Sequence, residues 1–258
     1  MSSTNNVANN SLIDIKDKFA KIKLCVFDMA GTTVNEDNLV YKTVRDSINQ
    51  SLRSADHSDI QVNLDLCLEY GAGKEKSKAI YDILNTLELS DAEIESLTST
   101  AFATFKDSLA TFKDSLATAY NQDTLAEFEG MSDLFEQLKN NGRHVVLNTG
   151  YDSKTANKIL TILGWSVGNQ VDALVTADDV DNGRPAPDMI TLAMKQFNIE
   201  DSQLVLKAGD SGIDIEEGQN AGCGLVVGVL SGAQNEQQLA KYQPDVILNK
   251  LTDLHELI

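Results

Sequence analysis

Lys23-Leu-Cys-Val-Phe-Asp28-Met-Ala-Gly-Thr-Thr33 is an apolar run that ends in a carboxylate and a turn. The run predicts a buried β-strand with Asp28 at its end. A carboxylate there can point at a ligand while backbone N–H groups of the turn face the same place. Taken alone, the segment is equally well explained as an ordinary strand-ending turn.

Four more short apolar runs follow along the chain, and segments with helical periodicity separate most of them. This alternation predicts an α/β fold with a mostly parallel sheet and helices on both faces. Ligands of such sheets bind beyond the carboxyl ends of the strands, so the residues after each run are the candidates for chemistry. The four runs are His144–Asn148, Ala173–Thr176, Leu204–Ala208 and Gly224–Val229.

One long stretch, from about Asn38 to Gln122, has helical patterning and no convincing buried strand. We therefore predict a helical cap domain over residues 38–122, inserted after the first strand of a core domain formed by residues 16–37 and 123–258. The first residues are rich in Ser and Asn and lack the basic and apolar parts of a signal peptide. They predict a disordered tail over residues 1–15.

A tandem repeat lies inside the predicted cap, where residues 103–109 (ATFKDSL) recur at once as residues 110–116. A seven-residue repeat keeps Phe105, Leu109, Phe112 and Leu116 near one helical face. A duplication that lengthened a cap helix explains the repeat. Alternatively, the repeated apolar face is the contact surface of a homodimer that forms through the cap.

The composition limits the class of partner. The 258 residues include 21 Lys and Arg against 39 Asp and Glu, a net charge of −18. This charge does not favour nucleic acid or an anionic membrane, and no run of about 18 apolar residues exists to span a membrane. Three widely separated cysteines predict buried, reduced thiols and a cytoplasmic protein.

Three further segments carry candidate chemistry. Thr149-Gly150 lies between a predicted strand and a helix predicted over residues 153–163. The hydroxyl and the free N–H groups of the helix start could bind an anion, or the segment could be an ordinary helix cap. Arg184 lies at the start of a proline-rich loop before a helix near Asp188. It could be a fixed cation that binds a phosphoryl oxygen, or an ordinary solvated arginine. Asp210 and Asp214 suit Mg²⁺, although Asp214 could instead cap a helix.

The four segments, in their order along the chain, resemble the four motifs of the haloacid dehalogenase superfamily. The resemblance covers nearly all of the chain after the first 20 residues. The helical insert is similar to that superfamily's cap. The resemblance implies a Rossmann-like core and a Mg²⁺-dependent hydrolase in which Asp28 attacks phosphorus and forms an aspartyl-phosphate. It implies Mg²⁺ ligands at Asp28, the Ala30 carbonyl and Asp210, with Asp214 acting through water. It also implies phosphoryl contacts from Thr149 and Arg184, and substrate contacts from Gly31, Thr32, Gly150 and Tyr151.

Ala30 indicates which subfamily of the superfamily the chain resembles. Most phosphatases of this superfamily carry a second Asp at this position as general acid and base, and a methyl group cannot protonate a leaving alkoxide. Alanine there is similar to phosphonoacetaldehyde hydrolases, in which a cap lysine forms an imine that delocalises the carbanion left by C–P cleavage. Lys74, in Tyr70-Gly-Ala-Gly-Lys74, resembles that family's Gly-x-x-Lys loop. A solvated lysine at a helix start is the ordinary explanation.

Two departures from that family lie beside Lys74. Tyr70 stands where the family has Met, and Ser77 stands where the family has a His that is thought to move protons. His57, elsewhere in the cap, is a candidate replacement for that His.

Four functions remain open at this stage. The leading one is a phosphonatase-like hydrolase that cleaves the C–P bond of phosphonoacetaldehyde or a related small phosphonate. The nearest rival is a phosphatase for a small phosphate ester, of the phosphoglycolate or sugar-phosphate type. A dehalogenase needs no metal and is disfavoured by the paired carboxylates. A non-catalytic ligand-binding protein on the same scaffold is the alternative from another class.

Overall fold

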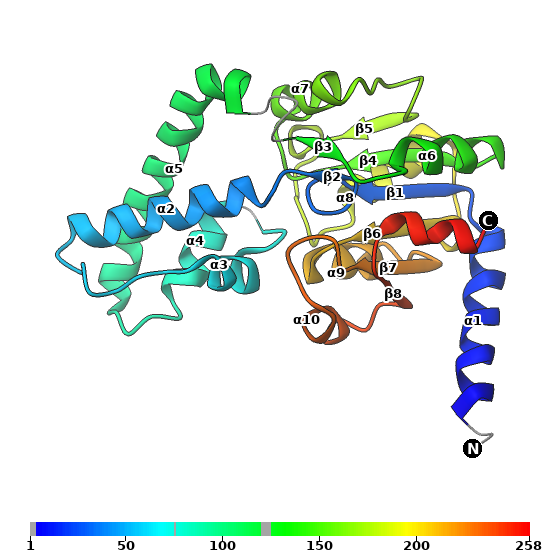
Figure 1. The fold of residues 1–258 in the computed structure, drawn as a ribbon, viewed down its shortest axis with the longest axis horizontal. Helices are drawn as coiled ribbons and strands as arrows, with labels where there is room; N and C mark the ends of the chain where they lie inside the picture. The colour runs from blue at the N-terminus through cyan, green and yellow to red at the C-terminus, as the bar shows by residue number, and fades with distance from the viewer. Residues whose placement is uncertain (1–3, 75, 120–124) are drawn as a thin grey trace.

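The computed structural model describes residues 4–74, 76–119 and 125–258, and for residues 4–12 and 109–119 only the course of the backbone (Figure 1). At its centre is a six-stranded parallel sheet in the order β5-β4-β1-β6-β7-β8. The predicted α/β class is confirmed, and all five predicted strands are present. The strands are β1 (Leu24–Asp28), β4 (His144–Asn148), β5 (Ala173–Val175), β6 (Val205–Gly209), β7 (Leu225–Val229) and β8 (Val246–Leu248).

Both faces of the sheet are covered, which explains why its strands are apolar throughout. In β1, Cys25 and Phe27 join one buried cluster, while Leu24 and Val26 join another on the opposite face. The alternation is that of a strand whose successive side chains point to opposite faces. The covering helices are α1 (Thr4–Lys21), α6 (Met131–Asn140), α7 (Ser153–Leu163), α8 (Asp188–Gln196), α9 (Gly212–Asn220) and α10 (Glu236–Ala240).

Helix α1 corrects the predicted disordered tail, because it begins at Thr4 within the segment 1–15. Ile15 and Phe19, one helical turn apart, are buried in the same cluster as Phe27 and Phe135. The Ser- and Asn-rich composition at the start of the chain gave no sign of the helix, which continues into this apolar stripe. The stripe anchors the C-terminal part of α1 to the sheet.

Four helices after β1 make a unit with its own buried cluster, and Figure 1 shows them grouped beside the sheet. Val44, Ile48 and Leu52 of α2 pack in this cluster with Ile80 of α4 and Leu97 of α5. Their spacing is that of an apolar helical stripe. The helices are α2 (Leu39–Ser54), α3 (Leu64–Gly71), α4 (Lys76–Leu84) and α5 (Asp91–Ala119), and we propose that they form the cap over residues 38–122, of which 75 and 120–122 lie outside the described residues.

The repeated heptad lies in α5. Phe105 is buried in the cluster of α2 to α5. The side chains of Leu109, Phe112 and Leu116 lie outside what the structure describes, so a dimer through this seam stays a prediction.

A short antiparallel pair, β2 (Val34–Asn35) with β3 (Ala126–Glu127), lies where the chain leaves and re-enters the sheet unit. Among the described helices, none has the length and apolar character needed to cross a bilayer. All three cysteines are free thiols: Cys25 and Cys67 are buried and Cys223 is half-buried.

Candidate active site

The strand order brings segments that are distant in sequence to one edge of the sheet. Strand β1 lies between β4 and β6, with Asp28 opposite Asn148 and Phe27 opposite Ala208. Thr149 and Asp210 therefore follow the strands on either side of Asp28. Parallel strands end at a common edge, where α/β sheets bind their ligands.

A cavity of about 420 Å³ lies at this edge. Most of the predicted site residues line it: Asp28, Ala30, Lys74, Thr149, Gly150, Tyr151, Arg184, Asp210 and Asp214. Other lining residues were not predicted, among them Glu36, Val40, Tyr41, Gly73, Lys76, Val180, Asp181 and Met189.

Gly31 and Thr32, which were predicted to contact substrate, are not among the lining residues. Thr32 is fully buried, and its hydroxyl has no hydrogen-bond partner among the described residues. Gly31 has φ +81°, and a Cβ built on it would lie 2.3 Å from Asp210 Oδ2. Its role in the structure is to let the Asp210 carboxylate come close to the turn after β1.

Three buried carboxylates converge in the cavity. Asp28, Asp210 and Asp214 each offer an oxygen, and these oxygens lie within 4.8 Å of one another. Burial raises the pKa of Asp210 well above its usual value, and the charges of Asp28 and Asp214 add to the rise. Burial also raises the pKa of Asp28, against the opposing effect of Arg184. A small group of hard oxygen donors with excess negative charge suits a divalent cation such as Mg²⁺.

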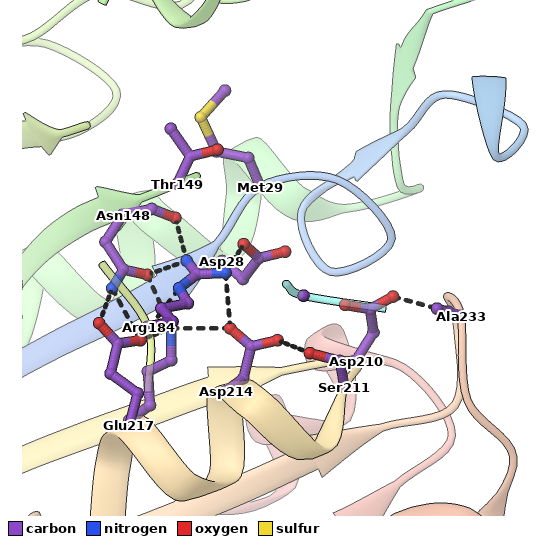
Figure 2. A network of polar contacts seen from close by, with 12 residues as sticks. Asp28, Met29, Asn148, Thr149, Arg184, Asp210, Ser211, Asp214, Glu217 and Ala233 are labelled. Atoms are coloured by element: carbon purple, nitrogen blue, oxygen red, sulfur yellow. Dashed lines mark hydrogen bonds and ion pairs between the residues drawn. The ribbon is translucent and has the colours of Figure 1, made fainter. Parts of the chain in front are cut away.

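Arg184 binds the nucleophile candidate directly. Its Nη1 lies 2.7 Å from Asp28 Oδ1 and 2.9 Å from Asp214 Oδ1 (Figure 2). The side chain is 5% exposed, so the alternative of a solvated loop arginine is wrong. Although burial alone would lower the pKa of Arg184, the carboxylates of Asp214 and Asp28 raise it, and the group stays a cation.

Asp214 lies inside helix α9 and does not cap it. The N-cap residue is Ser211, whose hydroxyl donates to Asp214 Oδ2 at 2.5 Å. Burial acts to raise the pKa of Asp214, but Arg184 and Lys207 hold it below its usual value. The carboxylate is thus kept ionised beside the other two.

A layer of buried polar side chains lies beneath the site (Figure 2), and the sequence analysis did not predict it. Lys207 Nζ lies 2.8 Å from Glu217 Oε2 and 3.1 Å from Asp214 Oδ1, and all three side chains are at most 1% exposed. Asn148 Oδ1 accepts from Lys207 at 2.7 Å and from Arg184 at 2.8 Å. Two features of the sequence could have revealed this layer: a lysine inside the apolar run of β6, and a carboxylate three residues after Asp214 on one helical face.

Lys74 reaches the cavity because Gly73 lets the turn after α3 touch helix α9. Gly73 has φ +71°, and a Cβ there would lie 2.5 Å from Ser211 Oγ. The N–H of Gly73 donates to the Tyr41 hydroxyl at 3.0 Å. Lys74 Nζ then pairs with Asp82 Oδ2 at 2.6 Å, so this lysine is not the solvated helix start that was the ordinary alternative.

The two residues discussed as proton carriers for Lys74 lie elsewhere. His57 Nε2 lies 3.3 Å from Glu93 Oε1 at the start of α5. Neither His57 nor Ser77 lines the cavity. The suggestion that His57 replaces the missing family His is therefore wrong, because its ring lies against Glu93 of α5 and away from the cavity.

Comparison with known proteins points to one family. Residues 22–222 match the family model described as haloacid dehalogenase-like hydrolase. Among curated relatives, a phosphonoacetaldehyde hydrolase of Latilactobacillus sakei is 42% identical over 96 residues, 37% of this chain and 36% of that protein. A pyrophosphatase PpaX of Bacillus velezensis is 30% identical over 52% of this chain and 60% of its own length. A PpaX of Listeria welshimeri is 26% identical over 92% and 97%.

The chain thus spans about a third of the phosphonoacetaldehyde hydrolase and three fifths of the Bacillus pyrophosphatase. Solved structures agree on the fold. A predicted phosphoglycolate phosphatase from Haemophilus somnus has a TM-score of 0.64 at 21% identity, over 92% of this chain and 98% of that one. A haloacid dehalogenase-like family hydrolase from Streptococcus pneumoniae has a TM-score of 0.65 at 16% identity, over 92% and 98%.

Proposed function

The chain belongs to the haloacid dehalogenase-like hydrolases, and we propose that it releases phosphate from a small phosphorylated metabolite through an aspartyl-phosphate on Asp28. The observation that carries the proposal is the grouping of Asp28, Thr149, Arg184 and the Asp210/Asp214 carboxylates around one cavity. A non-catalytic binding protein would not need a buried carboxylate held against an arginine at the end of the central strand.

The carboxylate cluster is the proposed metal site. We assign Mg²⁺ to Asp28, Asp210 and the Ala30 carbonyl, with Asp214 in support. When bound, Mg²⁺ neutralises charge on the phosphoryl group, so that a carboxylate can approach it. The crowding of three carboxylates, for which Arg184 and Lys207 are the cationic partners among the described residues, fits such an ion.

The remaining roles follow from the hydrogen bonds. Arg184 holds Asp28 Oδ1, which leaves the other oxygen of Asp28 as the attacking atom. The Thr149 hydroxyl oxygen accepts the N–H of Tyr151 at 3.2 Å, so its own proton can be donated to a phosphoryl oxygen. Gly150, after the end of β4 and before α7, also lines the cavity, and we assign its N–H to the same oxygen.

The state of Lys74 favours an ester as the substrate class. Its Nζ is held by Asp82 Oδ2 at 2.6 Å, and forming an imine would require that nitrogen to leave the carboxylate and attack the substrate carbonyl. A small phosphate ester, of the phosphoglycolate or sugar-phosphate type, is therefore the leading substrate. The second candidate is phosphonoacetaldehyde or a related phosphonate, favoured by the position of Lys74 in the wall of the cavity.

Phosphate release with Mg²⁺, from phosphonoacetaldehyde beside a panel of small esters and pyrophosphate, tests these assignments. We expect release from at least one ester, and loss of that release in Asp28→Asn. If the aldehyde is cleaved instead, Lys74→Ala should abolish cleavage and borohydride should trap a substrate adduct on Lys74.

Lys78→Ala is the matched control for Lys74→Ala. Lys78 also lies near Asp82, at 3.5 Å, but it is 67% exposed. An equal effect of the two substitutions would contradict a specific role for Lys74. No phosphate release from any compound of the panel would contradict the proposed function.

We also propose a cytoplasmic location, which agrees with three free cysteines. The net charge of −18 supports a small-molecule substrate over nucleic acid or an anionic membrane.

A further inference from the structure

Ala30 leaves the site without the carboxylic acid that would protonate a departing alkoxide. Ester hydrolysis then needs another proton carrier near the reacting oxygen. Besides the proposed metal ligands, the described residues that line the cavity include four with a carboxyl or phenol group: Glu36, Tyr41, Tyr151 and Asp181.

Glu36 is a buried carboxyl group, 5% exposed, that shares the cavity with Asp28 and Ala30. The local backbone explains its position. The chain turns back directly after β1, since the N–H of Val34 donates to the Met29 carbonyl at 2.8 Å. Glu36 follows β2, and this turn returns it to the end of β1.

Tyr151 fixes the direction of the Glu36 carboxyl group. Its hydroxyl donates to Glu36 Oε2 at 2.6 Å, and its backbone N–H donates to the Thr149 hydroxyl oxygen at 3.2 Å. The carboxyl group is thereby tied to the segment proposed to hold the phosphoryl oxygens.

The other proton-bearing groups suit the role less well. Burial raises the pKa of the Tyr41 phenol, and the charges of Asp210 and Glu36 raise it further, which makes it a weak acid. The hydroxyl of Tyr151 is already committed to Glu36, and Asp181 is exposed to solvent.

We infer that Glu36 is the general acid and base that replaces the acid missing at Ala30, an inference that rests on the proposed ester hydrolysis. As Asp28 attacks phosphorus, the P–O bond to the leaving group breaks and Glu36 gives its proton to the departing oxygen. Water then attacks the phosphorus of the aspartyl-phosphate, the P–O bond to Asp28 breaks, and Glu36 takes a proton from that water. Glu36 regains the proton it gave, and one water is consumed per phosphate.

Glu36→Gln tests the inference, because the amide keeps the shape and an acceptor for Tyr151 but has no dissociable proton. The substrates are p-nitrophenyl phosphate, whose leaving group needs no proton, and an alkyl phosphate hydrolysed by the wild type. On the alkyl phosphate we expect turnover to fall on the order of 10²-fold with no burst. On p-nitrophenyl phosphate we expect a burst of one nitrophenolate per active site and then slow turnover, because only the second step lacks its base.

Two further variants complete the design. Glu36→Gln combined with Ala30→Asp supplies an acid at the missing position and should recover turnover on both substrates by about tenfold or more. Asp181→Asn makes the same acid-to-amide change in the same cavity and should give no burst.

Unchanged turnover of the alkyl phosphate by Glu36→Gln would overturn the inference. So would an equal loss on both substrates without a burst, since that pattern belongs to a structural role. A wild type that hydrolyses no ester would overturn the proposed function and this inference together, whereas an active wild type with an unaffected Glu36→Gln overturns the inference alone.

Discussion

The Asp28 carboxylate is the proposed nucleophile and a proposed metal ligand. One of its oxygens is held by Arg184, and the group lies beside two other carboxylates. Removing the charge of Asp28 tests both proposed roles. We expect Asp28→Asn to lose about 10⁴-fold or more of kcat, as for other residues that form the covalent bond. The measurement is phosphate release with Mg²⁺ on the best ester, beside a thermal melt. A variant that folds and keeps more than a tenth of the activity would contradict the assignment.

The thiols make a second prediction at the scale of single residues. Burial raises the pKa of Cys25, Cys67 and Cys223 to about 12 in each case. At pH 8 the thiolate fraction is then on the order of 10⁻⁴, far below that of a free cysteine. We expect no reaction with a thiol-specific disulfide reagent in the native protein and three equivalents after unfolding in urea. Rapid modification of the native protein would contradict this.

At the scale of elements, the turn between α3 and α4 controls where Lys74 lies. In Gly73→Ala the new methyl group would meet Ser211 Oγ at 2.5 Å and the residue would keep φ +71° only with strain. We expect the turn to move away from α9 and kcat/KM to fall by about tenfold to a hundredfold, because a misplaced group near the reacting centre is costly.

Gly142→Ala is the matched control, since Gly142 has φ +75° and nothing within 4 Å of a built Cβ. Both variants should lose about 1–2 kcal/mol of stability through backbone strain. Only Gly73→Ala should lose activity. Equal activities would show that the contact between the turn and α9 does not matter for turnover.

Strand β6 and helix α9 are joined by the ion pair of Lys207 with Glu217, both fully buried. Lys207→Met leaves Glu217 and Asp214 with one fewer cationic partner, and breaking a buried pair costs about 3–5 kcal/mol. We expect a loss of that size in urea unfolding. Lys154→Met, at an exposed position of α7, should change stability by less than about 0.5 kcal/mol. Similar effects of the two substitutions would contradict the structural role of Lys207.

At the scale of the whole molecule, a metal at the carboxylate cluster should stabilise the fold. A ligand at about 100 times its Kd adds ~2.7 kcal/mol, which corresponds to roughly 5–10 °C in Tm for a chain of this size. We expect Mg²⁺ to raise Tm by that amount and EDTA to reverse the rise. Asp210→Asn should abolish the Mg²⁺ effect, whereas Asp181→Asn should keep it. A Tm that does not respond to Mg²⁺ would argue against the assigned site.

The sequence alone was enough to predict the α/β fold, the strands β1 and β4 to β7, and the segments around Asp28, Thr149, Arg184 and Asp210. These features are local. An apolar run that ends in a carboxylate or a threonine, followed by a turn, is visible in a few residues, and the carboxyl ends of parallel strands must meet at one edge. The order of the segments along the chain then gave the family.

The tertiary structure decided what lies beside those residues. Arg184 binds Asp28 across 156 positions of sequence, and Lys74 is paired with Asp82 because the turn before α4 folds back toward that helix. Glu36 is a candidate acid only because the fold brings its side chain to the cavity that Ala30 also lines. Contacts of this kind depend on how elements pack. The residues around a buried polar side chain can indicate that it needs a partner, as for Lys207, but they do not identify that partner.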